Sequence, residues 1–434
     1  MQATATIEDT LMPAPTVSRA YAWSVFALTF GLLLADFMSR YVLNAVFPLL
    51  KAQWLLSDTQ LGSLSSIVAL MVGLLTFPLS LLADRWGRVR SLILMAVLWS
   101  VATLGCAVSA NYGEMLVARL FVGVGEAAYG SVGLAVVLSV FPVHLRATLS
   151  GSFLAGGAFG SMLGMALSGI VASHFGWRWA FATMAIVGLV LAGIYRVVVT
   201  ERRLASNRRI DEPKSEARPR ITLRNLLPTL FASKAVIYAY AGSGVQLMVA
   251  GTLQAWLPSY LGRYYGMRVD HASALAAVFV LTMGVGMILC GMLTDRVSRH
   301  SAPRKWTMAI AYSVSSFVSL VVAFQLPPGP LQLALMGVGM FFVWGTSGPT
   351  GAMVANLTPP AIHATAIAVW ALANNLLGLA SGPIIAGMLA DRIGLHAALQ
   401  LMPFAAIGAA LLFMIGKRYY PSDLLRIASP RNEG

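Results

Sequence analysis

Long runs of apolar residues alternate with short polar segments along almost the whole chain. Most runs are long enough for an α-helix to cross about 30 Å of hydrocarbon. The runs are continuously apolar, whereas membrane strands alternate between apolar and polar positions, so the pattern predicts helices. Twelve spans are predicted, at 21–50, 59–83, 89–110, 112–138, 146–173, 177–198, 231–261, 272–295, 304–326, 330–357, 361–390 and 394–416.

The composition favours a membrane protein. The 434 residues are 58% hydrophobic and 11% charged, with a mean hydropathy of +0.76, whereas soluble globular chains have about 25% charged residues. The formal net charge is +14, but the positive residues fall mainly between the spans, which indicates membrane topology and not nucleic-acid binding. Cys106 and Cys290 lie in spans of different halves, and we interpret them as small core residues.

Polar segments divide the chain into five parts. We expect a tail at 1–18, a six-helix bundle at 19–198, a basic linker at 199–228, a second six-helix bundle at 229–417 and a tail at 418–434. The first tail has no positive region ahead of a short apolar core, so we do not expect a cleaved signal peptide. The linker is the longest polar segment, and a solvated connection is favoured there over a regulatory domain.

Positively charged residues give the orientation, because cytoplasmic loops are enriched in Lys and Arg. The loops after the second, sixth and eighth spans and the C-terminal tail are basic, whereas those after the first, third and ninth carry one such residue or none. We therefore expect both termini in the cytoplasm and a multi-pass protein of the inner (plasma) membrane.

The two halves repeat each other. LLADRWGR (81–88) after the second span corresponds to GMLTDRVSR (291–299) after the eighth. PVHLRATLSG (142–151) before the fifth span corresponds to PPAIHATAIA (359–368) before the eleventh, and a third variant, GMLADRIG (387–394), ends the eleventh. The predicted fold is thus an all-α membrane protein of twelve transmembrane helices, in two six-helix bundles related by pseudo-two-fold symmetry. Such repeats place a transport site near the membrane midplane between the halves.

Four charged residues stand inside spans of the first half: Asp36, Arg40, Arg119 and Glu126. Charges at a membrane centre cost at least roughly 2.5–3.5 kcal/mol on insertion scales, so they usually face a wet cavity. Arg119 and Glu126 are seven residues apart, which places them on one face of a helix. We expect Glu126 to be the principal proton carrier and Asp36 the second, because a carboxylate changes its preferred protonation state as its surroundings alternate between dry and wet. A static ion pair that fixes helix packing is the alternative.

A fixed cation at the midplane also attracts an anionic substrate. Arg40 and Arg119 are therefore candidate substrate ligands, although both could serve only to hold the acids. The other candidates are neutral polar or aromatic residues, for which a bond to a neighbouring helix is the alternative role. They are Asn44, Tyr129, Gln246, Gln254, Trp256, Trp344, Trp370, Asn374 and Asn375.

The loop Ala83-Asp84-Arg85-Trp86-Gly87-Arg88-Val89-Arg90 resembles the signature Gly-x-x-x-Asp-Arg-x-Gly-Arg-Arg of the major facilitator superfamily, with Ser80 in place of the leading Gly. The resemblance extends from about residue 20 to 417. RLFVGVGEAAYGSVGLAVV (119–137), WLPSYL (256–261) and NNLLGLASGPIIAGMLADR (374–392) are similar to the spinster-like and anion:cation symporter branches. Those branches usually carry Asn-Tyr-x-Asp-Arg in the first span, whereas this chain has Asp36-Phe37-Met38-Ser39-Arg40. Ser39 thus stands where those branches have an acid beside the Arg, and the acid of this chain, Asp36, lies one turn away.

The resemblance implies a rocker-type transporter with a cytoplasmic gate at the loop motifs, which latches the outward-open state. The gate residues are Asp84, Arg85, Gly87, Arg88, Arg146, Asp295 and Arg296.

The predicted function is proton-coupled movement of a small organic anion, and the alternative is transport of an amphiphile such as a lysolipid or drug. An enzyme is disfavoured, because the histidines lack metal-ligand spacing and the chain has no phosphate-binding Gly-Lys loop. A channel is disfavoured by the two-fold repeat with charges in one half. We expect no cofactor and no metal, and a monomer in the bilayer whose partners are the substrate and protons.

Overall fold

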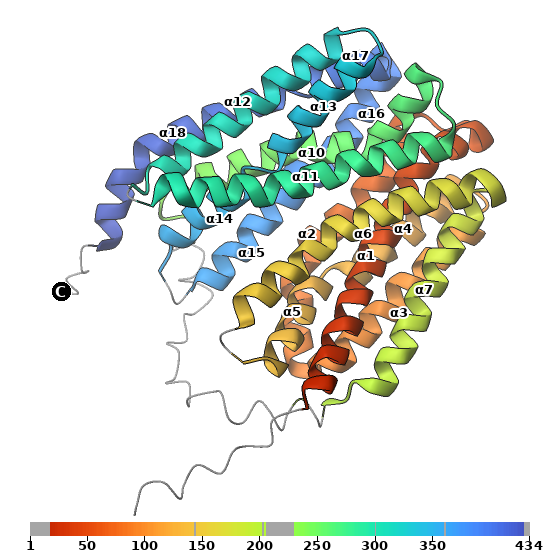
Figure 1. The fold of residues 1–434 in the computed structure, drawn as a ribbon, viewed down its shortest axis with the longest axis horizontal. Helices are drawn as coiled ribbons and strands as arrows, with labels where there is room; N and C mark the ends of the chain where they lie inside the picture. Colours follow the sequence, from red (N-terminus) through yellow and green to blue (C-terminus); the bar gives the residue numbers. More distant parts are fainter. Residues whose placement is uncertain are drawn as a thin grey trace, which may run out of the picture.

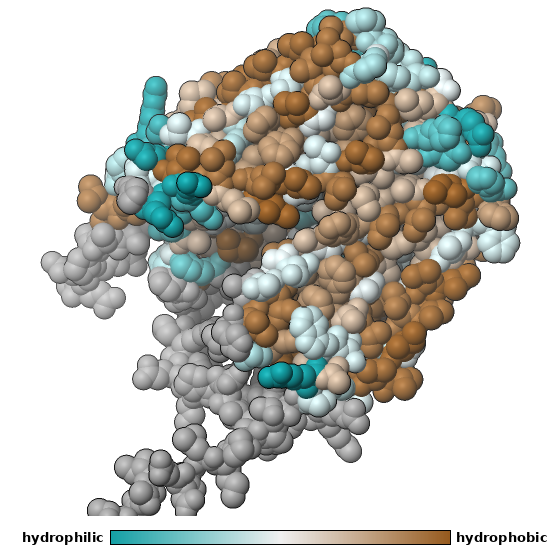
Figure 2. All heavy atoms as spheres, viewed as in Figure 1, coloured by the Kyte–Doolittle hydropathy of each residue, from teal (hydrophilic) through white to brown (hydrophobic). Residues whose placement is uncertain are grey.

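The computed structural model describes residues 18–142, 145–201, 204, 230–299, 301–359 and 362–428. The predicted N-terminal tail and almost all of the predicted linker lie outside the described residues. Within them the chain is helical, and twelve segments are long and apolar enough to cross a membrane. Figure 2 shows apolar side chains covering the flanks of both bundles on the visible face, with hydrophilic residues near the ends.

Two bundles lie side by side (Figure 1). The first contains α1 (Arg19–Trp54), α2 (Asp58–Trp86), α3 (Arg88–Val108), α4 (Tyr112–Glu126), α5 (Tyr129–Val140), α6 (Arg146–Phe175) and α7 (Trp177–Val198). The second contains α10 (Lys234–Tyr265), α11 (Val269–Ser298), α12 (Arg304–Gln325), α13 (Pro330–Val343), α14 (Ser347–Asn356), α15 (His363–Ala373), the π-helix η4 (Asn374–Ala380), α16 (Ser381–Ile393), α17 (Leu395–Leu401) and α18 (Phe404–Ala428).

Three spans predicted as single helices contain a change in helical geometry. The fourth span breaks at Ala127 and Ala128, directly after Glu126. The tenth breaks between Val343 and Ser347, and the eleventh contains the π-helix at Asn374–Ala380. Irregular turns of this kind are frequent at functional sites.

The last helix, α18, runs to Ala428, beyond the predicted end of the twelfth span at 416 and into the segment 418–434 expected as a tail. The extension is tied down because the Asp423 carboxylate accepts hydrogen bonds from the Ser233 hydroxyl at 2.8 Å and the Ala235 N–H at 2.9 Å. A carboxylate at the start of α10 is favoured by the helix dipole.

The bundles meet at one end, which we call the closed end. It is the end where α1 passes into α2 and α10 into α11. There a Cβ added to Gly62 of α2 would overlap the Pro383 carbonyl oxygen. At the opposite end, the terminus end, α1 begins and α18 finishes, and Asp84 and Arg85 at the end of α2 are exposed.

Candidate functional site

An arginine and a glutamate from two helices face each other inside the first bundle. Arg40 of α1 places its Nε 4.0 Å from Oε2 of Glu126, the last residue of α4. The side chains are 16% and 2% exposed. Among the described residues, neither carboxylate oxygen of Glu126 accepts a hydrogen bond. The long contact to Arg40 is therefore the main stabilisation of a deeply buried charge, which makes the pair easy to rearrange.

Asp36 adds a second carboxylate to the same place. It lies one turn before Arg40 and is buried, and its Oδ1 has no hydrogen-bond partner within the described part of the chain. Electrostatically, Glu126 repels the Asp36 carboxylate and Arg40 attracts it. Two acids thus depend on one partly accessible cation.

Arg119 has a different environment from the one expected from its spacing to Glu126. Its guanidinium donates to the carbonyls of Leu64 at 3.3 Å, Ser39 at 3.4 Å and Arg40 at 3.2 Å, and the residue is 1% exposed. Seven residues of helix rise about 10 Å, and helical side chains lean toward the N-terminus. The two side chains share a helix face, but they lie at different heights along α4. Arg119 ties α4 to the backbones of α1 and α2.

A small polar cavity lies where the two bundles meet at the site. Tyr41 donates to Gln254 Oε1 at 2.7 Å, and Asn44 donates from Nδ2 to the Gln254 carbonyl at 3.2 Å. That carbonyl is free because Pro258, four residues later, has no N–H. The cavity measures about 20 Å³, enough for one water. It is lined by Arg40, Tyr41, Asn44, Ser65, Ala69, Gly251, Gln254, Leu379 and Pro383.

Tyr41 and Ser65 were not identified from the sequence. The repeat indicates only that Asn44 and Pro48 occupy positions equivalent to those of Gln254 and Pro258. These pairs stand 210 residues apart, close to the 211-residue offset of the two loop motifs. The repeat does not indicate a role for Ser65. Its hydroxyl donates a hydrogen bond to Asn44 Oδ1 at 3.3 Å, a contact that arises only because α2 packs beside α1.

Four of the other predicted residues bond a neighbouring helix. They are Tyr129 to the Thr29 carbonyl, Gln246 to Ser316, Trp256 to the Pro383 carbonyl and Trp370 to Ser243. The Nε1 of Trp256 donates to Pro383 of α16 at 2.9 Å within the second bundle, and its ring reaches the first bundle, 5.3 Å from that of Phe47 in α1. Tyr129 and Gln246 bond within their own bundles, as the packing alternative predicts.

Trp344, Asn374 and Asn375 keep polar atoms available. Trp344 Nε1 and the Oδ1 atoms of both asparagines are buried without a partner among the residues that the structure describes. They stand at the break of the tenth span and in the π-helix of the eleventh. Buried polar atoms without a protein partner are candidates for water or ligand contacts.

The predicted gate residues lie at the terminus end. Asp84 pairs with Arg88 in its own bundle at 3.2 Å, and Arg85, Asp295 and Arg296 are exposed. Gly87 has a φ of 99° and separates α2 from α3, and Arg146 begins α6. No contact described here joins Asp84 to the second bundle, so its latch role stays a prediction.

The profile of the Major Facilitator Superfamily matches residues 29–348 and 240–429. The chain belongs to the major facilitator superfamily. It is a multi-pass membrane transporter, and the family is one of small-molecule carriers and not of enzymes. A solved bacterial homolog of the lysosomal transporter spinster, described as inward-facing and unoccupied, superposes with a TM-score of 0.83 at 19% identity, covering 94% of this chain and 99% of that one.

Two curated relatives share about a quarter of their residues with this superfamily member. A sphingosine-1-phosphate transporter of Danio rerio is 24% identical over 94% of this chain and 86% of its own length. A cis,cis-muconate transport protein of Acinetobacter baylyi is 26% identical over 93% and 97%, respectively. The predicted superfamily, the resemblance to its spinster-like and anion:cation symporter branches and the predicted fold are therefore confirmed.

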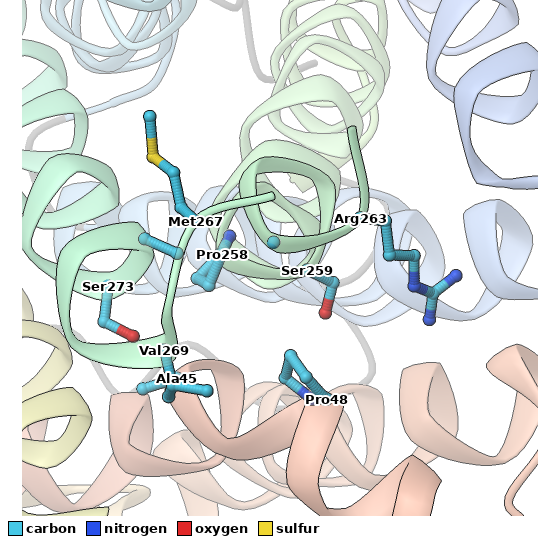
Figure 3. Close-up of a pocket in the computed structure, with 10 residues that line it drawn as sticks. Ala45, Pro48, Pro258, Ser259, Arg263, Met267, Val269 and Ser273 are labelled. Atoms are coloured by element: carbon cyan, nitrogen blue, oxygen red, sulfur yellow. The ribbon is translucent and has the colours of Figure 1, made fainter. Parts of the chain in front are cut away.

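A second cavity, of about 220 Å³, lies at the closed end between α1, α10 and α11 (Figure 3). The hydroxyl groups of Ser259 and Ser273 are buried there without a partner among the described residues. Arg263 stands at the side of this cavity. The lining of this cavity shares no residue with that of the small polar cavity, so it is separate from the central site.

Proposed function

We propose that this transporter couples the movement of a small organic anion to protons by alternating access. The observation that carries the proposal is the buried contact between Arg40 and Glu126, with Asp36 beside it. One cation faces two acids, and that cation is the most accessible member of the set.

Coupling follows from competition for Arg40. A substrate carboxylate that binds the guanidinium, with the two parallel hydrogen bonds that Arg favours, takes the cation from Glu126. Two unpaired carboxylates in a buried site are costly, so proton uptake by Glu126 relieves the cost. Release of the substrate returns Arg40 to Glu126 and favours release of the proton.

Substrate selection uses both bundles. Arg40 binds the anionic group from the first bundle, while Trp344, Asn374 and Asn375 supply neutral polar groups from the second. Transport of cis,cis-muconate by the Acinetobacter relative supports an organic acid of this kind. Arg119 positions the backbone under Arg40 and does not contact the substrate.

We assign the terminus end to the cytoplasm, because Arg85, Arg88 and Arg90 lie there around the junction of α2 and α3, and Arg296 and Arg299 lie there at the end of α11. The closed end then faces outward across the inner membrane, and the conformation described here is the inward-open one. We retain the monomer as the working unit.

An amphiphile is the second candidate substrate, favoured by the relationship to the sphingosine-1-phosphate transporter. Such a molecule also carries an anionic head for Arg40, but its chain would occupy the apolar part of the path.

The test is proton movement into proteoliposomes that contain a trapped pH dye. Organic acids, sugar acids and lysolipids are added one at a time to wild-type protein and to empty liposomes. We expect at least one organic acid to acidify the lumen only when the protein is present. Acidification by lysolipids alone would select the amphiphile, and tight binding without any proton movement by any compound would contradict proton coupling.

A further inference from the structure

A charged cluster at the closed end links the two bundles through Asp58, the first residue of α2. The Asp58 carboxylate accepts hydrogen bonds from Arg263 of α10 at 3.0 and 2.7 Å and from Lys51 of α1 at 2.6 Å. Its side chain is 5% exposed. Arg263 and Asp58 belong to different bundles, so this bidentate contact exists only while the closed end stays closed.

A second carboxylate crosses the interface at the same place. Asp391 of α16 accepts hydrogen bonds from the N–H of Asp58 at 2.7 Å, the N–H of Thr59 at 2.9 Å and the Thr59 hydroxyl at 2.6 Å. The first N–H groups of a helix have no partner within the helix, and a carboxylate is favoured at this positive end. One bundle therefore caps a helix of the other.

The two helices that meet here, α2 and α16, end in the same sequence motif. Leu-Ala-Asp-Arg-x-Gly occurs at 82–87, where α2 ends, and at 389–394, where α16 ends. In each case a Gly with positive φ stops the helix, Gly87 at 99° and Gly394 at 83°. The two spans run antiparallel, because the end of α16 meets the start of α2. Asp391 thus stands beside the start of α2, and Asp84 occupies the matching position of its own span at the opposite end of the molecule.

We propose that Asp391 and Arg263 form an interbundle latch that holds the closed end shut, and that Asp391 is the counterpart of Asp84 at the other end. In the conformation described here the Asp391 latch is made, while Asp84 is exposed and pairs with Arg88. When the bundles rock to open the closed end, Asp391 leaves the start of α2. The latch acts on the conformational equilibrium, whatever the substrate or coupling ion.

The chain offers a matched control. Asp423 caps α10 with a carboxylate in the same manner, but from α18 of the same bundle. Loss of that cap weakens one bundle without changing how the bundles meet. A charge-removing substitution at each acid therefore separates a latch from an ordinary helix cap.

The experiment measures the distance between spin labels across the closed end. Labels are placed by Leu55→Cys in the first bundle and His271→Cys in the second, both exposed, with Cys106 and Cys290 replaced by Ser. We expect Asp391→Asn to increase the long-distance, outward-open population at least threefold and Arg263→Gln to do the same, while Asp423→Asn leaves the distribution unchanged.

If Asp391→Asn does not fold, Arg263→Gln carries the test alone. An unchanged distance distribution in the folded latch variants would overturn the proposal. An equal shift with Asp423→Asn would also overturn it, because the effect would then be general weakening of the helices.

Discussion

At the scale of single residues, two arginines inside the first bundle have different surroundings. Arg119 has its guanidinium on three backbone carbonyls, whereas Arg40 faces an acid across 4.0 Å and remains partly exposed. Hydrogen bonds from charged groups contribute about 1.5–3 kcal/mol each, and a carbonyl left unsatisfied in an apolar environment adds to the loss. Arg119 thus ties α4 to the backbones of α1 and α2, and Arg40 stays available for the role that we propose for it in the site.

We therefore expect Arg119→Gln to lower the free energy of unfolding by at least about 3 kcal/mol, as when one partner of a buried charged contact is removed. Arg40→Gln should lower it less and should abolish transport. Thermal unfolding of purified protein in detergent, followed by fluorescence, compares the two variants with wild type. Equal melting temperatures for Arg119→Gln and wild type would contradict the structural role of Arg119.

At the scale of elements, small residues determine how closely the spans approach. A Cβ on Gly160 of α6 would meet the Leu34 carbonyl oxygen and the Phe37 side chain of α1, whereas a Cβ on Gly151 of the same helix meets nothing within 4 Å. Alanine raises helix propensity at both positions by roughly 1 kcal/mol. At Gly160 this gain is opposed by the steric overlap of the new Cβ with α1, whereas at Gly151 nothing opposes it.

The two glycines should therefore respond differently to substitution by alanine. Gly151→Ala should raise the melting temperature or leave it unchanged, and Gly160→Ala should lower it by an amount equivalent to about 1–3 kcal/mol, typical of overpacking. Thermal unfolding measures both. A melting temperature that rises equally in both variants would show that α1 and α6 do not approach as described.

The elements also show what the sequence can and cannot predict. Continuous apolar runs were sufficient to place all twelve spans, because length and hydropathy determine whether a helix can cross a bilayer. The break after Glu126 was not predictable from the local residues Ala127 and Ala128. At this break the Ala127 carbonyl accepts a hydrogen bond from the Thr76 hydroxyl of α2 at 2.5 Å, a tertiary contact that the local sequence does not reveal.

At the scale of the whole molecule, the site is assembled from chain segments far apart in sequence. Asp36, Arg40, Glu126 and Asn44 were predictable as site candidates, because charged and amide groups inside apolar spans are unusual. Which of the candidates pair with each other was not predictable, because a contact such as that of Asn44 with Gln254 depends on how α1 and α10 cross. Proton coupling and substrate binding by these residues remain predictions.

Alternating access makes one claim about the whole cycle. In the proposed cycle the bundles exchange which end is open, and protonation of Glu126 accompanies the movement of the carrier with its substrate bound. Exchange of substrate across the membrane needs only the loaded carrier to move back and forth. Accumulation driven by a pH gradient needs Glu126 to bind and release a proton in every cycle.

The most direct measurement is therefore accumulation against counterflow in proteoliposomes with Glu126→Gln, using a substrate identified with wild type. Glu114→Gln, which removes an exposed acid from the start of the same helix, is the control and should behave as wild type. We predict that Glu126→Gln loses pH-gradient-driven accumulation and keeps counterflow. Accumulation at the wild-type level in Glu126→Gln would contradict the account.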